Sequence, residues 1–290
     1  MSNSTDVGPN DTPPSGSSYR SRWRRFSPSM GWKAFWTEIV IVVLGVVIAL
    51  AANEAVQDWT WRNRVADAET RLQDDIAWVF LWSAEKAATQ PCTDAILATM
   101  SRNVLGSGET LQPVPVETIP GVGLEFVVRV PNRPYRFPVW DALVADGTAS
   151  HFTPQRQALL GRISGDMAQA RAYEAETRRL TGVLMVMRDP IALDRTVRAE
   201  LLTTISQLRS LTAYERLYAR QRMRMIADAG SAPTDEAVER FLNVEGNHPA
   251  GSDFSGVPHY CKSHDLSVAD WRDYRQVTTT MGAPATGDAK

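Results

Sequence analysis

Hydrophobic and polar positions follow two patterns along this chain. Residues 39–52 form an apolar run without a charge, IVIVVLGVVIALAA. Beyond this run, apolar residues recur at every third or fourth position, which places them on one face of an α-helix. The first such seam consists of Trp61, Val65, Ala68, Leu72, Ile76 and Val79. The chain therefore combines a segment that is apolar all round with an amphipathic helix that follows it directly.

Proline and glycine divide the sequence that follows. Gln90-Pro91 is predicted to end the first amphipathic helix, and a shorter helical pattern then runs to Gly106. Residues 107–138 are rich in Gly and Pro and contain the β-branched stretch Phe126–Val130, which predicts a short strand or hairpin. A short helix is expected over residues 138–146.

Two long helices are predicted next. Thr153-Pro154 supplies an N-cap and a proline at the first helical position. The seam of this helix is Leu159, Ile163, Met167, Ala170, Tyr173, Thr177, Leu180, Leu184 and Met187. Asp189-Pro190 is expected to end it and to cap the next helix, which stops near Gly230. The second seam is Val197, Leu201, Ile205, Leu208, Leu211, Tyr214 and Tyr218. So short a connection predicts an antiparallel helical hairpin, and Thr234 is expected to cap a last short helix.

The apolar run is predicted to cross a membrane. Its fourteen residues cover only roughly 21 Å against a hydrocarbon core of about 30 Å, so length alone also fits the buried helix of a soluble protein. The flanks favour the membrane, because aromatic residues gather where two interfaces would lie, and a helix from Trp36 to Trp59 rises about 34 Å. The residues expected at the interfaces are Arg22, Arg24, Arg25, Trp32, Lys33, Trp36, Trp59 and Trp61.

A cleaved signal peptide is the other interpretation of this run. Residues 20–25 are basic, and Ala49-Leu50-Ala51 has the small-x-small form of a cleavage site. Against cleavage, no Gly or Pro separates the apolar run from this site, and helical periodicity continues without a break over residues 53–82. We expect an uncleaved transmembrane helix over residues 34–56.

Charge determines the expected orientation. Lys and Arg are concentrated in the juxtamembrane segment 19–33, whereas acidic residues dilute them after the span, so the N-terminus is expected in the cytoplasm and the C-terminal domain in the periplasm, with the anchor in the inner membrane. The same basic cluster can bind anionic headgroups of the lipid bilayer. It is short and isolated in a chain of net charge −2, so no nucleic-acid partner is expected.

Composition outlines the domains. Residues 1–18 and 276–290 hold few apolar side chains and are expected to be disordered tails. Residues 57–275 are long enough for one extracytoplasmic helical domain. The predicted fold class is mainly α: an N-terminal transmembrane helix continuing into a stalk and an antiparallel helical bundle, with a short irregular or β-hairpin insertion.

Both cysteines, Cys92 and Cys261, fall after the predicted span. An even count in an oxidising compartment favours a disulfide, and two unpaired thiols are the alternative. Cys261 also lies near His248, His259 and His264, but their spacing matches no zinc pattern, and Gly246 and Pro249 argue against a helical carboxylate–histidine pair at Glu245 and His248. No metal is expected.

No set of residues has the spacing of a catalytic or cofactor site. Gly121-Val-Gly123 lacks the third glycine of a dinucleotide loop, and neither a nucleophile elbow nor a phosphate loop is present. Carboxylates such as Glu174 and Glu176 are interpreted as solvent-exposed partners of neighbouring arginines. We therefore expect neither enzymatic activity nor a cofactor.

The anchor resembles a bacterial membrane-protein family. The segment from Phe35-Trp36-Thr37-Glu38-Ile39 to Leu50, with Asn53-Glu54 after it, is similar to an uncharacterised family of single-pass proteins whose anchor has the pattern E-I-x-I-V-x-L-G-V-x-I-A-L. Trp140-Asp141 also resembles a recurring element of these proteins. The resemblance covers about residues 33–80 and implies an anchored helical extracytoplasmic domain, without an activity.

The sequence thus predicts a protein that acts by interaction. Envelope assembly or scaffolding is the first hypothesis, and an extracytoplasmic ligand-sensing bundle that signals through a partner is the alternative. Gly45 and Ala49 form a small-x-x-x-small pair that allows close helix contact, so the expected partners are a second copy or another envelope protein. A polar cavity within the bundle would favour sensing, and an exposed apolar groove would favour a protein partner.

Overall fold

The computed structural model describes residues 31–119, 123–243 and 257–276. The chain divides into two compact units, Met1–Asp58 and Trp59–Lys290. In the described part of the first unit, helix α1 (Trp32–Gly106) begins, and the apolar side chains from Val40 to Leu50 are exposed. This stretch of α1 is long and apolar enough to cross a membrane, by length and composition.

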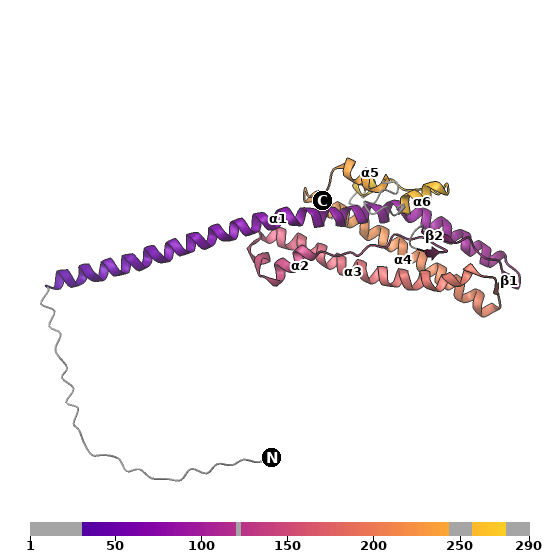
Figure 1. Ribbon diagram of the computed structural model, residues 1–290, viewed down its shortest axis with the longest axis horizontal. Coiled ribbons are helices and arrows are strands. Elements are labelled where there is room, and N and C mark those ends of the chain that lie inside the picture. The colour runs from indigo at the N-terminus through magenta and orange to yellow at the C-terminus, as the bar shows by residue number, and fades with distance from the viewer. Residues whose placement is uncertain (1–30, 120–122, 244–256, 277–290) are drawn as a thin grey trace, which may run out of the picture. The chain divides into compact units, whose positions relative to one another are not determined.

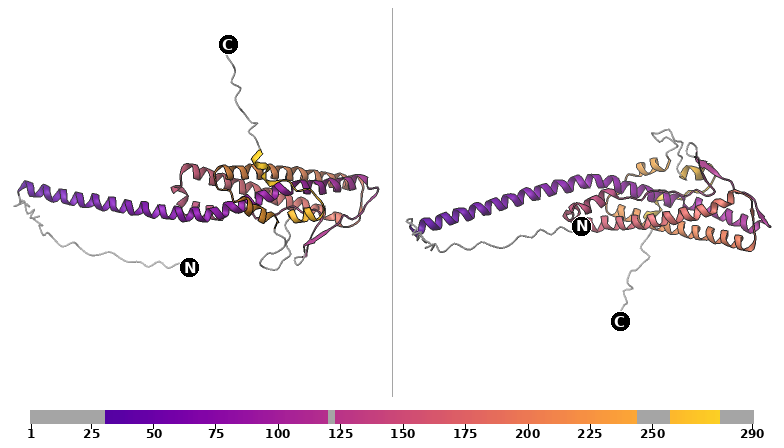
Figure 2. Two further views of the ribbon diagram at one scale, coloured as in Figure 1. Left: turned by 90° about the horizontal axis from the view of Figure 1, so that it is seen from above. Right: turned by 60° about the horizontal axis from the view of Figure 1, so that its bottom comes forward.

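The second unit is built mainly of helices. Its longest elements are the rest of α1, α3 (Pro154–Leu184) and α4 (Arg195–Asp228). The shorter helices are α2 (Pro138–Ala145), η1 (Thr148–His151), η2 (Met185–Arg188), α5 (Asp235–Asn243), α6 (Val257–Ser263) and η3 (Trp271–Gln276). Helices α3 and α4 run side by side as the predicted hairpin (Figure 1, Figure 2). The mainly α class is confirmed.

Four short strands form the insertion. Strands β1 (Thr110–Leu111) and β4 (Ile191–Ala192) pair antiparallel, and β2 (Glu117–Ile119) pairs antiparallel with β3 (Leu124–Phe126). The expected hairpin is therefore present, but the strand predicted over Phe126–Val130 ends at Phe126. Val127 and Val128, which follow this strand, are buried. Their β-branched side chains therefore pack in the core, although the two residues are not part of a strand.

Helix α1 does not end at Gln90-Pro91, so that prediction is wrong. The helix continues through Pro91 to Gly106. Proline removes one helical hydrogen bond, but the neighbouring Ala88 and Cys92 are buried, and the Ala88 carbonyl accepts from the backbone N–H of Ala269 at 2.8 Å. Tertiary packing holds the helix together where local propensity would break it.

Capping residues set the other helix starts. The Thr153 hydroxyl accepts from the Arg156 N–H at 3.3 Å, as predicted for the start of α3. Thr234 caps α5 by accepting from the N–H of Ala237 at 3.2 Å, again as predicted. The prediction for α4 is wrong, because its N-cap is Asp194, whose carboxylate accepts from Val197 N–H at 2.8 Å, while residues 189–190 precede β4.

The buried face of α4 differs from the predicted seam. Leu201, Ile205 and Leu208 are buried as expected. From there the buried positions are Thr212, Glu215, Ala219, Arg222, Met223 and Ile226. Tyr214 is 58% exposed and Tyr218 38% exposed, because this half of the helix turns both polar and apolar residues other than the predicted seam towards the interior.

Replacing Pro91 by alanine tests the continuity of α1. The change restores the missing N–H and removes the clash of the proline ring with the preceding turn, so we expect Pro91→Ala to raise the free energy of unfolding by about 1–3 kcal/mol. Chemical denaturation of the purified protein measures this. Ala98→Pro, in the same helix, is the mirror control and should lower it by about 3 kcal/mol. A loss of stability in Pro91→Ala would show that the fold requires the proline.

Candidate functional site

A cluster of charges is buried where the three long helices meet. Lys86 of α1 has its Nζ 2.7 Å from Glu174 Oε1 of α3 and 2.9 Å from Glu215 Oε2 of α4. All three side chains are buried. We call Lys86, Glu174 and Glu215 the buried ion cluster. Each long helix contributes one member, so the cluster joins all three.

Burial and pairing act in opposite directions on these groups. Burial by itself lowers the pKa of Lys86, but the carboxylates of Glu215 and Glu174 outweigh it and raise this pKa above its usual range. Burial raises the pKa of Glu174 despite the neighbouring Lys86 ammonium. The contacts of 2.7 and 2.9 Å hold the Lys86 ammonium group between the two carboxylates, which fits a structural link between the helices.

Further ion pairs surround the cluster. Arg133 binds Glu85 through two hydrogen bonds of 2.7 and 2.8 Å, and Arg222 donates to the Ser83 hydroxyl at 3.0 Å. Arg222 also lies 5.7 Å from the centroid of the Tyr135 ring. The backbone carbonyl of Tyr135 accepts from Arg171 at 2.8 Å, and its φ of 39° is the left-handed conformation that non-glycine residues rarely adopt. These contacts fasten the segment before α2 onto the bundle.

The interpretation of Glu174 as a solvent-exposed carboxylate is wrong, since only 1% of it is exposed. Glu176 does form the expected exposed pair with Arg179, at 2.7 Å. Sequence reasoning missed the cluster because it treated charged residues as surface. The available signal was that Glu174 and Glu215 each lie three or four residues from seam positions. Lys86 lies seven residues, about two helical turns, beyond Val79 of the first seam.

The predicted disulfide is confirmed. Cys92 of α1 and Cys261 of α6 are joined, both fully buried, with their Cα atoms 5.8 Å apart. Val257 packs against this bond, together with the partly buried Tyr260 and Leu266. The disulfide therefore holds the short helix α6 against α1.

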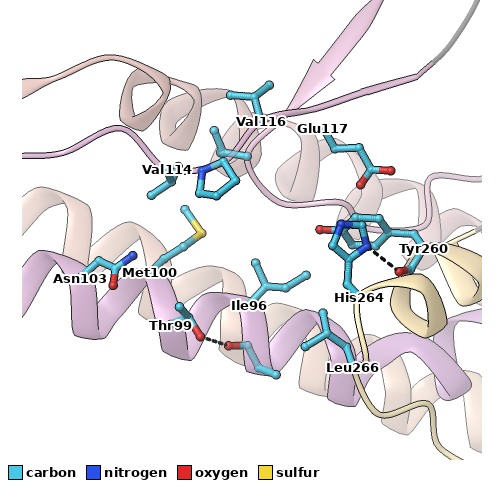
Figure 3. Close-up of a pocket in the computed structure, with 13 residues that line it drawn as sticks. Ile96, Thr99, Met100, Asn103, Val114, Val116, Glu117, Tyr260, His264 and Leu266 are labelled. Atoms are coloured by element: carbon cyan, nitrogen blue, oxygen red, sulfur yellow. Dashed lines mark hydrogen bonds between the residues drawn. The ribbon is translucent and has the colours of Figure 1, made fainter.

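Next to the disulfide, the second unit contains a cavity of about 310 Å³. Its walls come from α1, from residues 114–117 with Val127, and from the end of α6 with the residues after it. Figure 3 shows the Glu117 carboxylate directed towards the side that Tyr260 and His264 form. This cavity could not be predicted from residue patterns, because three segments far apart in the chain build it.

The other predicted site residues do not converge. Trp32, Lys33, Trp36 and Trp59 are exposed, whereas Trp61 stacks on His151 at 3.8 Å between ring centroids. Arg22, Arg24, Arg25 and His248 lie outside the described residues. At Gly45 an added Cβ would meet no atom within 4 Å, and Ala49 is exposed. No group of three His, Cys, Asp or Glu suited to a metal occurs in the part of the chain that the structure describes.

Breaking the buried ion cluster should be far more damaging than breaking a surface pair. Lys86→Met leaves two buried carboxylates without their cation, and we expect it to lower the free energy of unfolding by about 3–5 kcal/mol. Arg209→Met is the matched control, because it removes the exposed pair with Asp94 and should lower stability by less than about 1 kcal/mol. Denaturant titration measures both, and equal effects would contradict the structural role of Lys86.

Comparison with known proteins found no relative of this chain. The resemblance of the anchor to a bacterial family stays a prediction, and the site is interpreted from the residues of this chain alone. No family model, no curated protein and no solved structure matches this chain.

Proposed function

We propose that this protein is a single-pass inner-membrane protein that displays a helical interaction domain in the periplasm. The observation that carries the proposal is the exposed apolar stretch of α1, which belongs to the same helix as the core of the second unit. A charge-free apolar helix with every side chain from Val40 to Leu50 exposed is unfavourable in water and suited to lipid.

Two further observations support the orientation. The basic residues of 19–33 precede the span, which favours a cytoplasmic N-terminus. The disulfide between Cys92 and Cys261 belongs to the second unit, and such bonds persist in oxidising compartments such as the periplasm. Both observations favour the periplasmic side of the membrane for the helical domain.

The outer face of α3 and α4 supports a role in interaction. Tyr214, Leu217 and Tyr218 are exposed on α4, and Tyr173 of α3 lies 5.7 Å from Tyr218 between ring centroids. Beside them, a shallow groove of about 410 Å³ has a mixed lining of Leu180, Leu211 and Tyr214 with the polar Glu176, Ser206, Gln207 and Ser210. Exposed tyrosines next to apolar side chains are typical of protein interfaces. We name Tyr173, Tyr214, Leu217 and Tyr218 the tyrosine face and assign it to an envelope protein partner.

Ligand sensing is the second candidate function. The cavity next to the disulfide favours it, because a concave site of about 310 Å³ with apolar walls and a few polar groups has the character of a small-molecule site. The two functions use different parts of the second unit, so they can be tested separately.

Protease treatment of spheroplasts tests the topology. We expect cleavage beyond residue 60 with the N-terminal segment protected, because only the helical domain would be accessible. Mass spectrometry of non-reduced peptides should recover the Cys92–Cys261 pair, and permeabilised cells are the control in which the N-terminal segment is also digested. A mature N-terminus near Asn53 would overturn the anchor and identify a secreted protein.

Photo-crosslinking in intact cells tests the interaction role. A photoreactive amino acid at Tyr214, in the tyrosine face, should give a discrete adduct, whereas the same residue at the exposed Glu200 of α4 should not. The adduct mass distinguishes another envelope protein from a second copy of this chain. Identical patterns from both positions, or no adduct from Tyr214, would contradict an interaction through the tyrosine face.

A further inference from the structure

The tyrosine face continues a helical seam that the described part of the chain leaves exposed. Leu211, Tyr214 and Tyr218 follow one another at spacings of three and four residues, which is the period of a helix-bundle core. Leu211 is half-buried, whereas Tyr214 and Tyr218 are exposed. On α3, Tyr173 lies beside Tyr218, and Leu180 lines the groove with Tyr214. Helices α3 and α4 therefore present two adjacent rows to a further pair of helices.

The charged side chains in the middle of α3 have their partners within the chain. Arg171 and Arg178 donate to residues 132–135, at 2.8 Å to a backbone carbonyl and at 3.2 Å to a side-chain amide oxygen. Glu176, beside the groove, pairs with Arg179 at 2.7 Å. The remaining carboxylate of this stretch belongs to the buried ion cluster.

The same holds for the facing stretch of α4. Arg209 binds Asp94 of α1 at 2.9 Å, and Arg216 lies 3.5 Å from the Asp273 carboxylate. Arg220 donates to the backbone carbonyl of Asp273 at 2.7 Å. The carboxylate of this stretch again belongs to the buried ion cluster. In these described stretches of α3 and α4, the tyrosine face is therefore free of unpaired charge.

This charge pattern narrows the class of partner. A charged side chain placed on the tyrosine face would lose its water without gaining a counter-ion, which is unfavourable. Phenol hydroxyls both donate and accept hydrogen bonds, so a surface that carries them can pair with an identical surface. A second tyrosine face meets both conditions, and a two-fold axis is the symmetry that brings two identical faces together.

We propose that two copies of this chain pair through the tyrosine face, with Leu211, Tyr214 and Tyr218 of each copy against the α3–α4 hairpin of the other. The two hairpins then form a four-helix arrangement. The proposal rests on the proposed interaction function and names its partner. Anchoring in one membrane raises the effective concentration of two copies for each other, which favours their association without additional contacts.

Light scattering of the full-length protein in detergent micelles tests the proposal, because it gives the protein mass at each concentration. We expect a dimer that dissociates on dilution. Tyr214→Glu places a carboxylate from each copy in the contact and should raise the dissociation constant at least about tenfold. Ala175→Glu is the matched control and should leave the dissociation constant unchanged. Ala175 is exposed on α3 and lies two residues from Tyr173, about 200° around the helix.

Two outcomes of this measurement would overturn the proposal. One is a wild-type protein that stays monomeric at every concentration, and the other is an unchanged dissociation constant in Tyr214→Glu. Gly45→Ile tests the anchor as the other contact, and loss of the dimer in this variant alone would also overturn the proposal. The melting temperature and the intact disulfide check that each variant is folded.

Chemical cross-linking in the membrane gives an independent test. The two native cysteines are joined and buried, so Leu217→Cys provides a single free thiol in the tyrosine face. A short bis-maleimide should convert Leu217→Cys into a covalent dimer and leave Ala175→Cys monomeric. Equal yields of dimer from the two positions, or no dimer from Leu217→Cys, would contradict pairing through this face.

Failure of this proposal is distinguishable from failure of the interaction function. A monomeric protein whose photoreactive residue at Tyr214 forms an adduct with a different protein would overturn the second copy as the partner and support the interaction function. A monomeric protein that gives no adduct at Tyr214 would overturn both.

Discussion

The architecture of the second unit depends on the ion pairs of one buried lysine. Lys86 lies between Glu174 and Glu215, at 2.7 and 2.9 Å, and takes one partner from each helix of the α3–α4 hairpin. Hydrophobic packing holds three helices together but tolerates sliding, whereas a buried charge requires its partners in place. The cluster therefore specifies the register of α1 against the hairpin.

This constraint explains the unusual surface of α4. Thr212, Glu215 and Arg222 share the inner face of its second half with buried apolar residues, and Tyr214, Leu217 and Tyr218 lie on the exposed side. The tyrosine face is thus the complement of the polar interior. The inner face of α4 finds its partners within the chain, whereas the tyrosine face is exposed to solvent.

The cavity and the ion cluster lie in different packing environments. The cluster is closed and its one ammonium group lies between two carboxylates, which fits a structural role, whereas the cavity is open and three segments of the chain build it. A short helix held by a disulfide forms one of its walls, so the cavity depends on the covalent link as well as on packing. The ion cluster and the cavity are thus separate regions of the second unit.

The sequence alone determined the features that depend on local chemistry. The apolar run, the caps at Thr153 and Thr234, the helical hairpin and the pairing of the only two cysteines follow from spacing and residue type. Tertiary structure decided the rest. Pro91 lies inside α1 because the residues around it pack in the core. Glu174 is buried because it pairs with Lys86, which lies on another helix. The cavity belongs to this second group, since the residues around it come from segments that only the fold brings together. The local residue pattern indicates which secondary structure one segment favours. Whether a buried charge finds a partner, or an apolar face is covered, depends on how several elements pack together.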